Sequence, residues 1–103
     1  MDRIEKLKDL LAANDKDAFL RHALALEYIK GGDDEKAKKL FQAILSEEPG
    51  YVGSYYHLAK LLERNNELDA AVKYYEFGMA EAKKAGDMHS YYELQAAWED
   101  LTE

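Results

Sequence analysis

The sequence predicts an all-α protein, a stack of antiparallel helix pairs with about six helices. The first observation is a self-match at a spacing of 34 residues, a period typical of helical repeat arrays. Two groups of residues recur at this spacing: Leu24, Ala25 and Tyr28 as Leu58, Ala59 and Leu62, and Ala37 and Phe41 as Ala71 and Tyr75. The second observation is that apolar residues fall three or four positions apart, as in a helix, and no segment alternates convincingly like a strand.

Helix-breaking residues divide the chain into six segments. Asn14-Asp15 ends the first segment and offers a cap for the second. Gly31-Gly32 closes the second segment because glycine adopts the left-handed conformation easily, and Asp33 or Asp34 is placed to cap the third. The remaining breaks are Pro49-Gly50, where proline lacks the N–H of a helix interior, Asn65-Asn66 and Gly86-Asp87.

The two end segments match parts of the repeat. Stepping back 34 residues from Phe41, Ile44 and Leu45 reaches Leu7, Leu10 and Leu11, so the first segment matches a second helix and is expected to cover one open end. In the last segment, Tyr91, Leu94 and Trp98 match the opening of a third repeat, two residues late. A long fifth helix, from Glu67 to about Lys84, would absorb this shift.

These residues resemble the tetratricopeptide repeat, a helix-turn-helix with a fixed pattern of aromatic, leucine and small residues. The first copy departs from the pattern at Arg21, where an aromatic is usual, and the second at Lys83, where proline is usual. Small residues allow the helices of a repeat to approach closely: Ala25, Ala37, Ala59 and Ala71. The resemblance implies a right-handed superhelical stack forming one domain over 1–103, with a half-repeat helix at 1–15, repeats at 18–51 and 52–85, and a capping helix at 87–102.

Composition argues against several classes of protein. The chain has no cysteine, so it has no disulfide framework and no cysteine zinc site, which fits a reducing compartment. Its formal net charge of −7 would repel nucleic acid. The first residues alternate in charge and no apolar run is long enough to span a membrane, so we expect a soluble, cytoplasmic protein without a membrane partner.

No catalytic, metal or cofactor site is predicted. His22, His57 and His89 would lie at similar heights on successive helices, but their spacings match no known metal motif. The chain shows no nucleophile motif and no glycine-rich phosphate loop, so we expect no enzyme. Some tetratricopeptide domains hold a partner's C-terminal carboxylate with Lys, Asn and Arg. Their positions here carry other residues, so this clamp is absent: His22, Leu26, His57, His89 and Glu93.

The first helices of stacked repeats would line a concave groove, which can hold an extended or helical segment. The candidate groove residues are Phe19, His22, Leu26, Tyr56, Lys60, Arg64, His89 and Tyr92. Of the adjacent tyrosine pairs, we assign Tyr55, Tyr75 and Tyr91 to the core. Tyr56 and Tyr92 are assigned to ligand contact. The Tyr74 side chain is expected to cover a helix boundary. The alternative interpretation is that the groove residues serve only in packing or at a rim.

The sequence therefore predicts a non-catalytic module that binds a peptide or protein segment in its concave groove. Lys60 and Arg64 would steer acidic residues of such a segment. The alternative is a structural subunit that forms homo-oligomers through tyrosine-rich surfaces. Neither the partner nor the pathway follows from the sequence.

Overall fold

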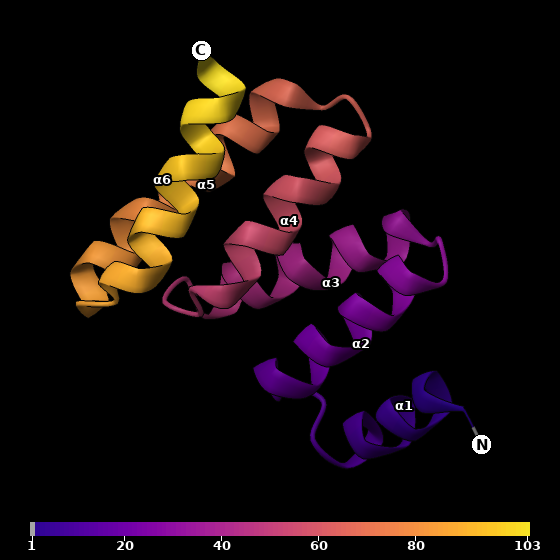
Figure 1. Cartoon of the computed structure of the whole chain (residues 1–103). Helices are drawn as coiled ribbons and strands as arrows, with labels where there is room; N and C mark the ends of the chain where they lie inside the picture. The colour runs from indigo at the N-terminus through magenta and orange to yellow at the C-terminus, as the bar shows by residue number, and fades with distance from the viewer. Residues whose placement is uncertain (1) are drawn as a thin grey trace. The chain divides into compact units, whose positions relative to one another are not determined.

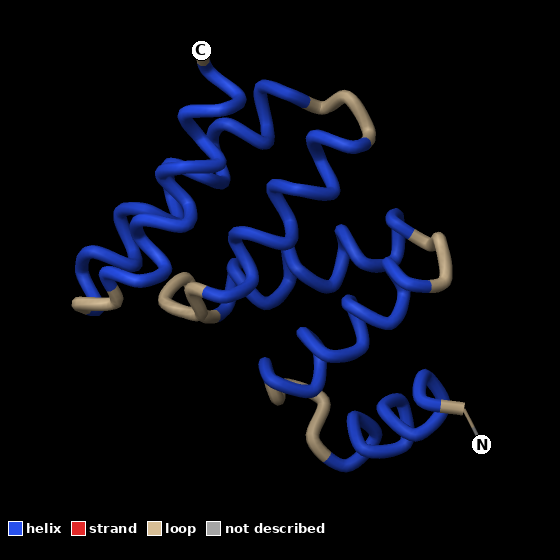
Figure 2. Tube along the Cα trace, viewed as in Figure 1, coloured by secondary structure: helices blue, strands red, loops and turns tan. Residues whose placement is uncertain are grey.

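The computed structural model describes residues 2–103. Within them the chain consists of α-helices joined by short loops, without strands (Figures 1 and 2). This confirms the all-α fold class. The six helices of this range are α1 Arg3–Ala13, α2 Ala18–Lys30, α3 Asp34–Glu47, α4 Gly53–Arg64, α5 Leu68–Ala85 and α6 Met88–Thr102. No helix in this range is both long enough and apolar enough to cross a membrane.

Aspartate side chains begin four of the helices. The carboxylates of Asp2, Asp17, Asp33 and Asp87 each accept a hydrogen bond from the backbone N–H three residues later, which satisfies one of the unpaired donors of a helix start. The predicted cap of α3 at Asp33 is confirmed. The expectation that Asn14-Asp15 caps α2 is wrong: Asn14 ends α1, and Asp17 caps α2 because it directly precedes the first helical residue.

Left-handed backbone ends three of the helices. Gly32 after α2 has φ 84°, Asn66 after α4 has φ 62° and Gly86 after α5 has φ 73°. Gly32 and Asn66 occupy the same position of the 34-residue period. Both repeats therefore use a left-handed residue at this position to form the turn between their two helices. α5 has 18 residues against 14 for its counterpart α3, which confirms the predicted long fifth helix.

The chain forms two compact units, Met1–Glu48 and Pro49–Glu103. In the first unit, α1 packs on α2, and α2 packs on α3. Ala25, Ala37 and Phe41 are fully buried between α2 and α3. In α1, Leu7 is buried as expected, but Leu10, the counterpart of fully buried Ile44, is 53% exposed. α1 packs against α2, and this packing buries Leu7 but leaves Leu10 exposed.

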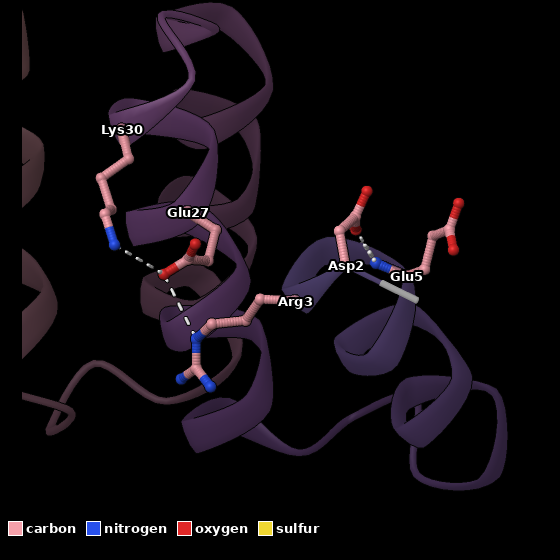
Figure 3. Close-up of polar contacts among 5 residues, drawn as sticks. All are labelled: Asp2, Arg3, Glu5, Glu27 and Lys30. Atoms are coloured by element: carbon pink, nitrogen blue, oxygen red, sulfur yellow. Dashed lines mark hydrogen bonds and ion pairs between the residues drawn. The ribbon is translucent and has the colours of Figure 1, made fainter.

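Ion pairs connect distant parts of the first unit. Figure 3 shows the Arg3 side chain of α1 reaching Glu27 of α2, where Nε and Oε2 lie 3.2 Å apart. Arg21, which stands where an aromatic is usual, is buried, and its Nη1 donates to Glu47 Oε2 at 2.5 Å. Lys16 Nζ lies 2.8 Å from the other oxygen of Glu47. The hydrogen bond from Lys16, followed by that from Arg21, lowers the pKa of Glu47 below its usual value.

The second unit is built from α4, α5 and α6, with α5 packed against both others. Tyr55, Leu58, Ala59 and Leu62 of α4 are buried. The Tyr55 hydroxyl also donates to the carbonyl oxygen of Pro49 at 2.6 Å. Its ring is thus held at both ends, and the start of α4 is fixed to the chain before it.

Two aromatic residues of α6 are only half-buried. Tyr91, assigned to the core, is half-buried, while its counterpart Tyr55 is 4% exposed. Trp98 is also half-buried and donates from Nε1 to Glu76 of α5 at 3.0 Å. Tyr55 lies close to Gly78 of α5, whereas the Tyr91 ring lies beside Lys83 and the exposed ring of Tyr92.

Candidate functional site

The groove residues predicted in the first unit lie along α2. Phe19 is 69% exposed, whereas His22 and Leu26 are half-buried. The His22 ring meets the buried ring of Phe41 edge-on, with centroids 5.5 Å apart. His22 therefore has a packing role as well, and Phe19 is the exposed ring of this helix.

In the second unit, α4 brings Tyr56 and Lys60 together, one helical turn apart. Lys60 Nζ lies 5.6 Å from the centre of the half-buried Tyr56 ring, within the range of a cation–π contact. Lys60 Nζ is also 3.7 Å from Glu63 Oε2. Arg64 is exposed at the end of the same helix. The ring of Tyr56 is thus partly covered by the lysine chain, and the lysine charge has a carboxylate beside it.

Glu63 links this surface to the core. It accepts a short hydrogen bond from the hydroxyl of Tyr75, a ring that is fully buried. Burial, and then the hydrogen bond to Glu63, raises the pKa of Tyr75 far above its usual value. In the first repeat the corresponding residues are Phe41 and Ile29, so this polar contact belongs to the second unit. It holds Glu63 in place beneath Lys60.

Two more predicted site residues, His89 and Tyr92, are exposed on α6. Tyr92 is 61% exposed, and its ring meets the half-buried ring of Tyr91 edge-on at 5.4 Å. The Tyr91 ring in turn lies 5.9 Å from Lys83 Nζ at the end of α5. Neighbouring tyrosines thus divide as predicted: one ring rests on the protein and the other faces outward.

His57 lies at the side of this surface, half-buried and edge-on to Tyr56 with centroids 5.7 Å apart. Burial lowers the pKa of His57, and the nearby charge of Glu93 on α6 acts in the opposite direction. Burial thus favours the neutral form of the imidazole. Across residues 2–103, no three His, Asp or Glu side chains are arranged to hold a metal ion.

Two features of the second unit were missed by sequence reasoning. Gly78 is buried where α4, α5 and α6 meet: an added Cβ would lie 2.7 Å from Tyr55 Cβ and 3.0 Å from Leu94 Cδ1. A glycine inside a helical segment, at the repeat position where the first repeat has Ile44, was the available signal. The second feature is Phe77, 56% exposed on α5 with its ring 6.1 Å from Tyr74. Tyr74, which was expected to cover a helix boundary, lies in α5 as well and is half-buried.

Comparisons with known proteins agree over most of the chain. A family model described as tetratricopeptide repeat matches residues 29–97. TPR repeat-containing protein PA0015 of Pseudomonas aeruginosa is 31% identical over 91 residues, which are 88% of this chain and 87% of that protein.

Solved structures show the same similarity. The solution structure of a tetratricopeptide repeat domain protein from Salinibacter ruber superposes with a TM-score of 0.81 at 38% identity, covering 84% of this chain and 87% of the other. Protein BPP2914 from Bordetella parapertussis reaches a TM-score of 0.83 at 27% identity, covering 98% and 88%. The sequence and the fold therefore point to the same family.

Proposed function

Because this chain belongs to the tetratricopeptide repeat family, we propose that it binds a peptide or protein segment and performs no catalysis itself. Proteins with this fold generally mediate protein–protein interactions and are typically non-catalytic. The proposed binding surface in the second unit consists of Tyr56 and Lys60 on α4 and His89 and Tyr92 on α6. A reducing compartment such as the cytoplasm suits a chain without cysteine.

The observation that carries this proposal is the exposure of Tyr92. A tyrosine ring has a large apolar face, a polar tip and few rotatable bonds, so it contributes to binding at low entropic cost. Tyr92 is 61% exposed although its neighbour Tyr91 packs against the protein. In the first unit, Phe19 and the half-buried His22 and Leu26 of α2 form a separate candidate surface. Arg64 adds an exposed positive charge at the end of α4 in the second unit.

Self-assembly is the second candidate function, and Phe77 favours it. This ring is 56% exposed on α5 and forms a small aromatic patch with Tyr74. A homo-oligomer formed through this patch would show a mass that falls on dilution and would dissociate with Phe77→Ala. A protein that binds a foreign segment would keep its mass under both conditions.

The binding proposal is tested with peptides selected on the wild-type protein from a random library. The selected peptides are then titrated into the Tyr56→Ala, Tyr92→Ala double variant. We expect a loss of about 1 kcal/mol or more in binding free energy for each ring that acts as an anchor. Phe77→Ala, which removes an equally exposed ring from another face, is the matched control.

Circular dichroism must show equal helicity for all the variants. Unchanged affinity in the double variant, with binding lost in Phe77→Ala, would move the binding surface to α5.

A further inference from the structure

The exposed side of α6 carries an apolar row. Met88, Tyr92 and Ala96 are spaced four residues apart, so they lie on the same side of the helix. All three are exposed, Met88 by 38% and Tyr92 by 61%. A row of this kind can receive one or two apolar side chains of a bound segment, but by itself it does not select among segments.

Acidic residues flank this row. Residues 85–103 contain five Asp or Glu and no Lys or Arg. Glu93, Glu99 and Asp100 are exposed on α6, and no ion pair within residues 2–103 involves any of them. Glu99 lies two turns beyond Tyr92, and Asp100 lies two turns beyond Glu93. The apolar row thus has uncompensated negative charge along one side and at its end.

Lys60 on α4 does not offset the negative charge of α6. Lys60, the basic residue beside Tyr56, already lies next to the carboxylate of Glu63. A second copy of α6 is a poor occupant as well, because two such helices side by side would place like charges against one another. The charge of α6 therefore favours a partner of opposite sign.

We propose that α6 binds a basic segment, with an apolar side chain of that segment on Tyr92 and Met88 and its Lys or Arg side chains on Glu93, Glu99 and Asp100. This inference rests on the proposed function and reverses the preference for acidic segments that Lys60 and Arg64 suggest. Glu93 and Asp100 are seven residues apart, about 10 Å along the helix axis. The matching partner has two basic residues at this distance, seven positions apart in a helix or about three apart in an extended chain.

The test uses two labelled synthetic peptides without aromatic residues. Both carry leucines at the same helical positions, and their charged positions are all Lys in one peptide and all Glu in the other. Fluorescence anisotropy at low salt measures their binding to the full chain. We expect the Lys peptide to bind at least about tenfold more tightly than the Glu peptide, and the preference to shrink as salt is added.

Variants locate the site. Glu93→Gln, Asp100→Asn should weaken binding of the Lys peptide about fivefold or more, and Tyr92→Ala should weaken it similarly. Glu35→Gln, Glu48→Gln removes the same charge from exposed positions of the first unit, and Phe77→Ala removes an exposed ring from α5. Both controls should bind within about twofold of wild type.

Four results would overturn the inference. They are equal affinity for the two peptides, preference for the Glu peptide, binding of neither peptide, and equal losses in the α6 variants and their controls. Tight binding of the Glu peptide that depends on Tyr92 would contradict the basic partner and leave the proposed function standing. A library-selected peptide whose affinity is unchanged in the Tyr56→Ala, Tyr92→Ala double variant would contradict the proposed function itself.

Discussion

Gly78 lies at a close approach of α4 and α5 in the second unit. An added Cβ would meet the Cβ of Tyr55 at 2.7 Å, a distance that requires atoms to move. The Tyr55 ring cannot shift freely, because its hydroxyl is held by the Pro49 carbonyl. The missing side chain at residue 78 therefore sets the separation of α4 and α5.

Gly78→Ala tests this packing. Overpacking of a core costs about 1–3 kcal/mol, whereas Ala in place of Gly inside a helix gains about 1 kcal/mol. We expect a net loss in the free energy of unfolding, measured by urea denaturation. Gly50→Ala adds the same methyl group where nothing lies within 4 Å and should be nearly neutral. A stabilised Gly78→Ala would mean that the helices are farther apart than described.

The buried hydroxyl of Tyr55 makes the free energy of unfolding decrease at alkaline pH. Burial, with smaller contributions from Glu81 and Tyr74, raises its pKa from 10.0 to about 12. The unfolded chain therefore loses this proton first, so the stabilisation is complete below about pH 10 and declines as pH rises toward about 12. We expect Tyr55→Phe to show a shallower decline of the urea midpoint over this range.

The control for this experiment is Tyr92→Phe, which removes a hydroxyl from an exposed ring and should keep the wild-type slope. Parallel pH curves for wild type and Tyr55→Phe would show that burial does not raise the pKa of the Tyr55 hydroxyl.

At the scale of the helix, the turns after α2 and α4 depend on one left-handed residue each. Gly32 fills this position in the first unit and Asn66 in the second. A residue with a Cβ pays about 1–2 kcal/mol to adopt this conformation, and Asn is among the few residues that tolerate it. The two turns thus share a shape and differ in intrinsic strain.

Replacements at residue 66 should follow this order of strain. Asn66→Gly should equal or exceed wild-type stability, and Asn66→Ala should lose about 1 kcal/mol. Thermal melting of the three proteins would show the ranking. If Asn66→Ala has the same melting temperature as wild type, the chain reverses after α4 without a left-handed residue.

Sequence reasoning succeeds where the signal is local. The helix ends are indicated by Gly32, Asn66 and Gly86. The four small residues predicted at helix contacts are fully buried: Ala25, Ala37, Ala59 and Ala71. Sequence reasoning fails where burial depends on a distant part of the chain. Arg21 is buried because Glu47, 26 residues away, receives its guanidinium group, and nothing near Arg21 in the sequence indicates this partner.

The same limit applies to the candidate site. Tyr92 and His89, which sequence reasoning proposed as groove residues, are exposed. Tyr92 is more exposed than Tyr91 because neighbours on a helix point in different directions. Sequence reasoning did not predict that Tyr91 is only half-buried. That outcome depends on which helices surround α6, a property of the assembled unit. The groove across successive repeats stays a prediction.

At the scale of the whole chain, α6 covers the apolar side of the second unit. Leu94 of α6 is 1% exposed and lies against Gly78, and Trp98 is held to α5 through Glu76. Without α6, the Tyr55 and Gly78 surface of α4 and α5 would lose this cover. A terminal helix with a polar outer face is what a repeat array needs to remain soluble.

Truncation after residue 85 tests this role. We expect the fragment 1–85 to aggregate or to unfold without a cooperative transition, measured by light scattering and by thermal melting. A milder variant, Leu94→Ala, should stay soluble and lose about 2–5 kcal/mol of stability. A soluble fragment with the wild-type melting temperature would show that α6 is dispensable for folding.

Within each unit, the helices that pack together are neighbours in the sequence: α1 with α2, α2 with α3, α4 with α5, and α5 with α6. The longest connection inside a unit is the short segment between α1 and α2. Little loop entropy is therefore lost before the first contacts form. Chains dominated by such local contacts fold within about microseconds to milliseconds. The exposed apolar rings of an unfolded chain would thus be available for aggregation only briefly, both during synthesis and after thermal stress.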